Sequence, residues 1–147
     1  MLSMRLEQTF SVNQPPEVVF DYLTNPSNLA DWQTSKTSVE QLTDGPPRLG
    51  TRIRERTKAP GGKEFEQIVE FTEFDRPRRV HVHIVEGPFP VDAIYSFEPD
   101  GEGTRVHFVT EGEMRGLARV LQPVLELIMG RRMTGFHRNL RHNIETN

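Results

Sequence analysis

Glu55 is the ionisable residue whose position in this 147-residue chain most strongly suggests chemistry. It lies in segment 51–58, where positions 52, 54, 56 and 58 are all Arg or Lys. This alternation is typical of a strand with one buried face, so it predicts that the cations face solvent and that Glu55 faces the interior. An interior carboxylate could act as a general base or bind a ligand hydroxyl. The alternatives are a shifted strand register or a rim carboxylate paired with an arginine of a neighbouring strand.

Gln67, Tyr95 and Thr110 are polar residues on segments whose other inward positions are mostly apolar. Burying such groups without hydrogen-bond partners costs about 1–3 kcal/mol each. They are therefore expected either to bond one another and the backbone, or to orient a ligand in an apolar cavity. Trp32 is expected at the entrance of that cavity or in the ordinary core. If the protein is an enzyme, Glu55 and Tyr95 are its candidate catalytic residues.

His81 and His83 alternate on one predicted strand, which places their side chains on one face about 7 Å apart. Two histidines could begin a metal site, but the sequence signals no third ligand, and a metal-free surface pair is the preferred interpretation. The chain has no cysteine, so it has no thiolate nucleophile. Neither H-E-x-x-H, nor G-x-S-x-G, nor a glycine-rich phosphate or dinucleotide loop is present. No metal and no cofactor are predicted.

The element that would position these residues is a long C-terminal helix over residues 114–144. Its apolar residues recur at steps of three and four, which predicts a single apolar face about eight turns long. Pro123 lacks a backbone donor, so a bend is predicted between positions 116 and 123. If the contact between this helix and its partner surface leaves room for a guest, the segment before the bend is predicted to be the movable side of that cavity. Three residues are expected to face its mouth or its guest: Leu117, Leu121 and Leu125.

The rest of the chain alternates mainly at period two. A strand is predicted over residues 4–12, followed by two short helices that begin at Pro15-Pro16 and at Asn25-Pro26. Short links between the later strands indicate an antiparallel meander. Six further strands are predicted, at residues 35–42, 51–58, 64–74, 79–86, 89–98 and 104–113. The facing of 79–86 is ambiguous, and the chosen interpretation turns Val80, Val82 and Ile84 inward and both histidines outward.

The length of the chain fits one domain, residues 1–147, with a real core. The predicted fold class is α+β: a strongly twisted antiparallel sheet of about seven strands wraps the long helix in the order β-α-α-β6-α. The net charge of −3 gives no support for nucleic-acid binding. No signal peptide and no membrane-spanning run are visible, so a cytoplasmic protein without membrane insertion, monomeric or homodimeric, is expected.

Five stretches resemble, in order, motifs of the START-like (SRPBCC) superfamily, and specifically of its polyketide cyclase/dehydrase and lipid-transport family. They are Pro15-Pro16-Glu17-Val18-Val19-Phe20-Asp21-Tyr22, the segment from Asn25-Pro26 to Trp32, Arg48-Leu49-Gly50-Thr51, Glu73-Phe74-Asp75-Arg76-Pro77-Arg78-Arg79 and Gly103-Thr104-Arg105-Val106. The resemblance covers essentially the whole chain. It implies the helix-grip fold, with a cavity between the sheet and the long helix that holds an apolar or amphipathic small molecule. The family includes lipid carriers, hormone receptors and aromatase/cyclases, so the resemblance implies no single chemistry.

The predicted function is binding of a hydrophobic or amphipathic small molecule, for transport or sequestration. One alternative is an aromatase/cyclase- or dehydratase-like enzyme, and another is a stress-response or assembly partner without a ligand. The absence of a convergent acid–base pair favours binding. Contacts with the ligand are predicted for Trp32, Ile53, Glu55, Gln67, Val69, Val82, Tyr95, Phe108, Thr110, Leu117, Leu121 and Leu125.

Overall fold

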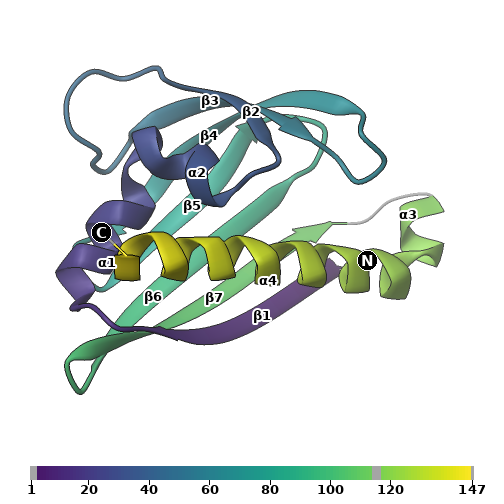
Figure 1. Ribbon diagram of the computed structural model, residues 1–147. Helices are drawn as coiled ribbons and strands as arrows, with labels where there is room; N and C mark the ends of the chain where they lie inside the picture. The colour runs from purple at the N-terminus through teal and green to yellow at the C-terminus, as the bar shows by residue number, and fades with distance from the viewer. Residues whose placement is uncertain (1–2, 114–116, 147) are drawn as a thin grey trace.

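The computed structural model describes residues 3–113 and 117–146, and its largest element is a seven-stranded antiparallel sheet (Figure 1). The sheet order is β1-β7-β6-β5-β4-β3-β2. The strands are β1 (Ser3–Val12), β2 (Lys36–Gln41), β3 (Arg52–Lys58), β4 (Glu64–Asp75), β5 (Arg79–Glu86), β6 (Val91–Asp100) and β7 (Gly103–Glu113). The helices are α1 (Pro16–Thr24), the 3-10 turn η1 (Pro26–Asn28), α2 (Leu29–Trp32), α3 (Leu117–Val120) and α4 (Gln122–Thr146). The predicted α+β class and the predicted order of elements are confirmed.

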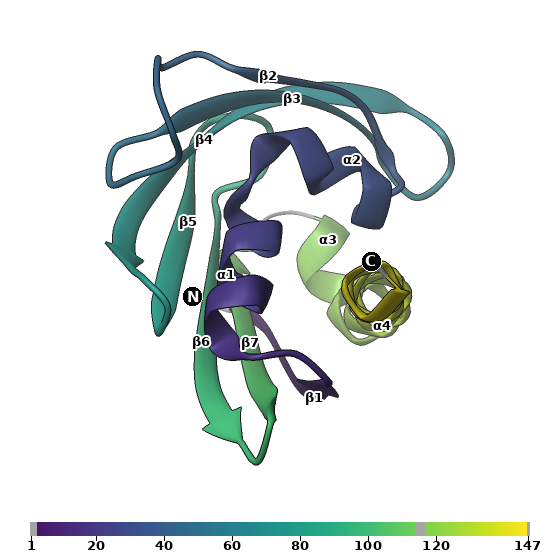
Figure 2. The ribbon, with the colours of Figure 1, turned by 60° about the vertical axis from the view of Figure 1, so that its left-hand side comes forward.

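The sheet curves around α4, as a view close to the axis of that helix shows (Figure 2). The short helix α2 lies between β2 and α4, and α1 packs against β6, β7 and α4 (Figure 2). Two asparagines of α4 fasten α2 in this place: Asn139 donates to Trp32 O (3.3 Å) and Asn143 donates to Asp31 O (3.2 Å). Asn25 caps η1 by accepting a hydrogen bond from Ser27 N at 3.0 Å. Local capping and long-range bonds therefore both position Trp32.

Alternation along β3 sorts its side chains as the sequence predicts. Ile53 and Glu55 are buried, whereas Arg52 and Arg54 are exposed on the outer face. The exposed arginines pair with carboxylates of neighbouring strands, as Arg52 does with Glu70 at 2.8 Å. The same rule holds on β4, where Gln67, Val69 and Phe71 are buried, and on β7, where Val106, Phe108 and Thr110 are buried. On β5, Val80 is fully buried while His81 and His83 lie on the other face.

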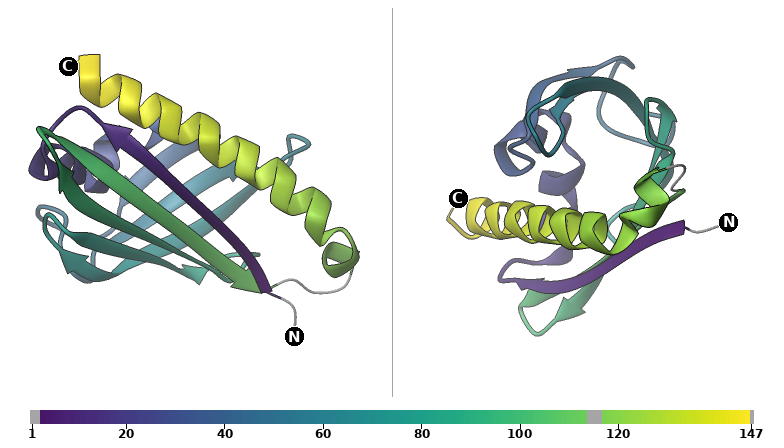
Figure 3. Two further views of the ribbon diagram at one scale, coloured as in Figure 1. Left: turned by 90° about the horizontal axis from the view of Figure 1, so that it is seen from below. Right: turned by 90° about the vertical axis from the view of Figure 1, so that its right-hand side faces the viewer.

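The C-terminal half of α4 supplies the core contact, since Phe136, Leu140 and Ile144 are buried. The helix runs along β1, and α3 lies at the end of the molecule where β1 begins (Figure 3). A break falls at Leu121, between α3 and α4, inside the stretch predicted to bend. The part of that stretch at position 116 lies outside the described residues.

The prediction of one continuous apolar face over residues 114–144 is wrong. Pro123 is the second residue of α4, where its missing donor costs little, so the helix starts afresh after Leu121. Val124 comes sixteen residues before Leu140, which at 3.6 residues per turn turns it about 160° away from the core. The end of α3, the break and the first turns of α4 leave a set of large aliphatic side chains exposed: Val120, Leu121, Val124, Leu127 and Ile128.

Candidate functional site

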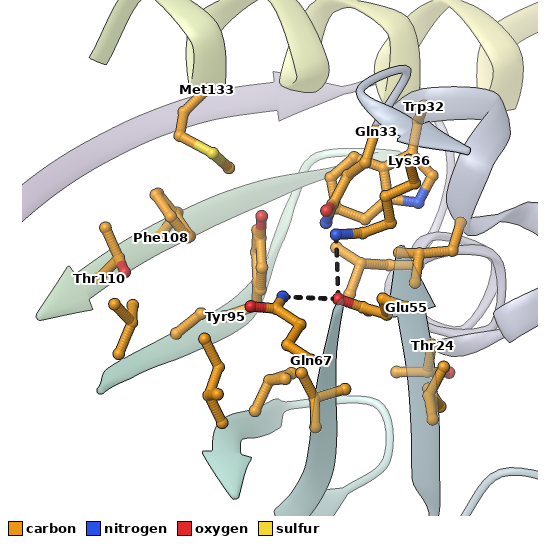
Figure 4. Close-up of a pocket in the computed structure, with 18 of the residues that line it drawn as sticks. Thr24, Trp32, Gln33, Lys36, Glu55, Gln67, Tyr95, Phe108, Thr110 and Met133 are labelled. Atoms are coloured by element: carbon orange, nitrogen blue, oxygen red, sulfur yellow. Dashed lines mark hydrogen bonds and ion pairs between the residues drawn. The ribbon is translucent and has the colours of Figure 1, made fainter. Parts of the chain in front are cut away.

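A pocket of about 220 Å³ lies inside the curved sheet, beneath α2 and α4. Its wall is mostly apolar. Nine of the twelve predicted contact residues line it: Trp32, Ile53, Glu55, Gln67, Val69, Val82, Tyr95, Phe108 and Thr110. They come from α2 and from β3 to β7, so the tertiary fold brings together residues that are far apart in the sequence. Figure 4 shows most of the lining as sticks.

Of the three leucines predicted at the mouth, the two whose side chains the structure describes are not among the lining residues. Leu121 is 52% exposed and Leu125 is partly buried, and neither reaches the pocket. The side chain of Leu117 lies outside the described part of the structure. Because α4 restarts after Leu121, the residues that reach the pocket from this helix are Met129 and Met133. That the segment before the break moves stays a prediction.

An ion pair is buried at one side of the pocket. Lys36 Nζ lies 3.0 Å from Glu55 Oε1, and the two side chains are only 6% and 5% exposed. Gln67 lies directly opposite Glu55 in the β3–β4 ladder and donates from Nε2 to the same oxygen at 2.8 Å. These three side chains lie together, whereas Phe108, Thr110 and Met133 occupy the other side of the pocket (Figure 4). Glu55 is therefore an inward carboxylate with a cation of its own.

Lys36 is the functional candidate that the sequence did not reveal. A β-bulge shifts the register of β2 between Lys36 and Ser38. Lys36 and Val39 consequently both point inward, although an odd spacing places residues on opposite faces of a regular strand. Alternation alone would have separated them. The only available signal was the position of Lys36 near the start of a predicted strand, and that signal is weak.

Most other polar groups of the lining are bonded within the protein. Their partners are close and specific: Thr24 Oγ1 donates to Phe20 O (2.8 Å), Thr110 Oγ1 donates to Asp92 O (2.9 Å), and Asn25 Oδ1 accepts from Ser27 N (3.0 Å). By contrast, Glu55 Oε2 and Gln67 Oε1 accept no bond from any described residue, and Lys36 Nζ has Glu55 as its single described partner. Trp32 Nε1, in the same lining, is also buried without a partner among the described residues. The hydrogen-bonding capacity that the protein leaves unused in the lining therefore includes this ion-pair cluster and the Trp32 indole.

Tyr95 belongs to a second polar network, which is complete. Gln8 donates from Nε2 to Gly130 O (2.9 Å) and Thr134 Oγ1 (3.0 Å), so its Oε1 must accept from His137 Nδ1, 2.8 Å away. His137 then carries its proton on Nδ1, and its Nε2 accepts from the Tyr95 hydroxyl at 2.8 Å. The sequence could have drawn attention to Gln8, a polar residue on an otherwise apolar strand face. Nothing local pointed to His137.

Burial decides the protonation of this network. It raises the pKa of the Tyr95 phenol well above its usual range, and it lowers the pKa of His137 from 6.5 to about 4. Both groups are consequently neutral near neutral pH, in agreement with the hydrogen-bond directions. Because the Tyr95 hydroxyl donates its hydrogen bond to His137, this pair is poorly placed to act as an acid or a base near neutral pH.

His81 and His83 face away from the pocket and share one carboxylate. His81 Nε2 lies 2.9 Å and His83 Nδ1 lies 2.7 Å from Asp92 Oδ1. Partial burial would by itself raise the pKa of Asp92, but the hydrogen bonds and the electrostatic attraction of the two histidines together outweigh it, and the pKa lies below its ordinary value. Among the residues that the structure describes, no group of three or more His, Asp or Glu side chains could hold a metal ion.

Comparisons with known proteins place this geometry in a family. A family model described as "Polyketide cyclase / dehydrase and lipid transport" matches residues 3–145. The chain belongs to that family. No curated protein matches the sequence.

Solved structures share the fold at low sequence identity. The protein TTHA0849 from Thermus thermophilus superimposes with a TM-score of 0.81 at 23% identity and covers 97% of both chains. A START superfamily protein from Mycobacterium smegmatis gives 0.79 at 15%, again over 97% of both chains. The Zhui aromatase/cyclase from a Streptomyces species gives 0.77 at 16%, over 98% of this chain and 94% of that one. The helix-grip fold predicted from the sequence is thereby confirmed.

None of the described helices is long and apolar enough to cross a membrane.

Proposed function

We propose that the protein binds a compact hydrophobic or amphipathic molecule in the pocket between the sheet and α4. The observation that carries the proposal is the wall of the pocket, where Trp32, Ile53, Val69 and Phe108 present buried apolar surface. An apolar pocket with a few polar groups is the usual form of a small-molecule site. Its volume of about 220 Å³ is below the range of about 300–1,000 Å³ typical of drug-sized ligands, which favours a small guest.

A titration can test this proposal, because Trp32 is the only tryptophan and lines the pocket. We expect the fluorescence of Trp32 to change saturably on addition of 1-octanol. Calorimetry should give a matching heat of binding. Ala93→Phe should weaken binding by about tenfold or more, since the ring would occupy space that the guest needs. Ala30→Phe, at an exposed position of α2, is the matched control and should leave affinity unchanged.

Native mass spectrometry of protein purified from its own host complements the titration, because a retained small molecule would identify the natural guest. The proposal fails if no small apolar or amphipathic compound gives saturable binding, or if Ala93→Phe binds as well as the unchanged protein.

A cyclase- or dehydratase-like enzyme is the second candidate, and one observation favours it. Glu55 is a buried carboxylate at the pocket wall whose Oε2 has no partner among the described residues, so it could accept a proton from a bound substrate. Its pairing with Lys36 argues the other way, because the carboxylate already has a buried cation as its partner. Glu55→Gln separates the two functions: an enzyme would lose turnover of a polyketide-like substrate while still binding it.

A further inference from the structure

The Lys36–Glu55–Gln67 cluster has the chemistry to select one kind of guest. It offers the pocket both donors and acceptors: the remaining ammonium protons of Lys36, and the two oxygens Glu55 Oε2 and Gln67 Oε1. A partner that satisfies both must itself donate and accept. A hydroxyl, a phenol or a primary amide does so, whereas an ether or a ketone only accepts.

The charges of the cluster favour a neutral guest over a charged one. Lys36 and Glu55 lie 3.0 Å apart and largely out of water, so their charges compensate each other inside the wall. A carboxylate guest would bring an additional negative charge beside Glu55, with its own desolvation cost and no unpaired cation to offset that cost. A neutral guest adds no charge to the cluster.

We infer that the pocket takes a compact amphipathic molecule whose apolar body lies against Phe108 and Met133 and whose neutral hydroxyl-type head bonds to Lys36 and Glu55. This inference rests on the proposed function and names its substrate class. The head donates to Glu55 Oε2 and accepts from Lys36 Nζ. Figure 4 shows the two sides of the pocket that correspond to body and head.

Three probes of similar length test the head group: 1-octanol donates and accepts, 1-methoxyheptane only accepts, and octanoate is charged at slightly alkaline pH. Dissociation constants come from Trp32 fluorescence and calorimetry on the full chain. 1-Octanol is expected to bind about tenfold more tightly than the ether, because one bond to a buried charged group is lost. The affinity for 1-octanol should also exceed the affinity for octanoate by at least about tenfold, because the carboxylate of octanoate must be desolvated next to Glu55.

A variant that removes the cluster should remove the preference. Lys36→Met/Glu55→Met/Gln67→Met keeps side-chain size and leaves an apolar wall, so the alcohol and the ether should bind it equally. Lys58→Met is the matched control, because Lys58 is an exposed lysine at the end of β3. It should retain the tenfold preference. The circular dichroism spectrum of each variant establishes that it is folded.

The possible results are distinguishable. Equal affinity of the unchanged protein for alcohol and ether, or tighter binding of octanoate, overturns the head-group inference while pocket binding stands. Binding of none of the three probes overturns both the inference and the proposed function. The three probes on the unchanged protein decide the matter even if the triple variant does not fold.

Discussion

Two polar networks border the same apolar pocket, and they differ in what they leave unused. In the Tyr95–His137–Gln8 network, the phenol, both imidazole nitrogens and the amide all have partners inside the protein. In the Lys36–Glu55–Gln67 cluster, one carboxylate oxygen takes both described contacts, and the other oxygen accepts nothing from the described residues. Polar identity alone does not mark a binding site. Unused donors and acceptors in the pocket lining are the observation on which our head-group proposal rests.

The complete network has a structural explanation. It joins β1, β6 and α4 through hydrogen bonds, and the rings pack around it, with Phe10 stacked on His137 at 4.6 Å and Tyr95 against Phe108 at 4.8 Å between ring centroids. A fully satisfied buried network makes the packing of its elements specific. Holding α4 on the sheet therefore accounts for Tyr95 and His137, whereas contact with a guest is what we propose for the Lys36 cluster.

Breaking the buried ion pair should give the largest effect. Glu55→Met leaves the Lys36 ammonium buried without its counter-ion, which should cost about 3–5 kcal/mol of unfolding free energy. Adding Lys36→Met should recover most of that loss, because both charges are then gone. Urea unfolding followed by circular dichroism measures both values. A loss below about 1 kcal/mol for Glu55→Met would mean that the pair behaves like a surface pair.

The complete network should make stability depend on pH. The pKa of His137 is about 4 when folded and 6.5 when unfolded, so the unfolded chain binds more protons between these values. Its contribution is fully present above pH 6.5 and is lost as pH falls to about 4, with a total of about 3 kcal/mol.

Urea unfolding at several pH values measures this loss, and His137→Gln is the comparison because it cannot take up the proton. The unchanged protein should lose about 3 kcal/mol more than His137→Gln over this range. Parallel pH profiles for the two proteins would contradict the assignment.

Replacing Arg54, the residue next to Glu55 in the chain, should have the smallest effect on the unfolding free energy. Arg54 is on the outer face of β3, 2.9 Å from Glu40 and 3.3 Å from Glu66, with a side chain that is 45% exposed. Arg54→Gln should change the unfolding free energy by less than about 1 kcal/mol, because solvent screens an exposed pair. The same urea measurement checks it. A loss comparable with that of Glu55→Met would remove the distinction between the two faces of the strand.

The sequence by itself determined the strand faces and the order of elements. Glu55, Gln67, Tyr95 and Thr110 lie inward as alternation predicts, because the two-residue period of a strand is a local property of the backbone. The capping residue Asn25 and the glycine- and proline-rich turns are local signals as well, and they delimited the elements within a few residues.

Only the tertiary structure decided which polar groups meet. A bulge turned Lys36 toward Glu55, the fold brought His137 to Gln8 across 129 positions of the chain, and the break at Leu121 set Met129 and Met133, rather than Leu121 and Leu125, at the pocket. Helical spacing could not choose between these faces, because the start of α4 and the surface beneath it set the rotation of the helix. The distinction between the open and the complete network depends on such contacts, since hydrogen-bond partners distant in sequence leave no periodic signal.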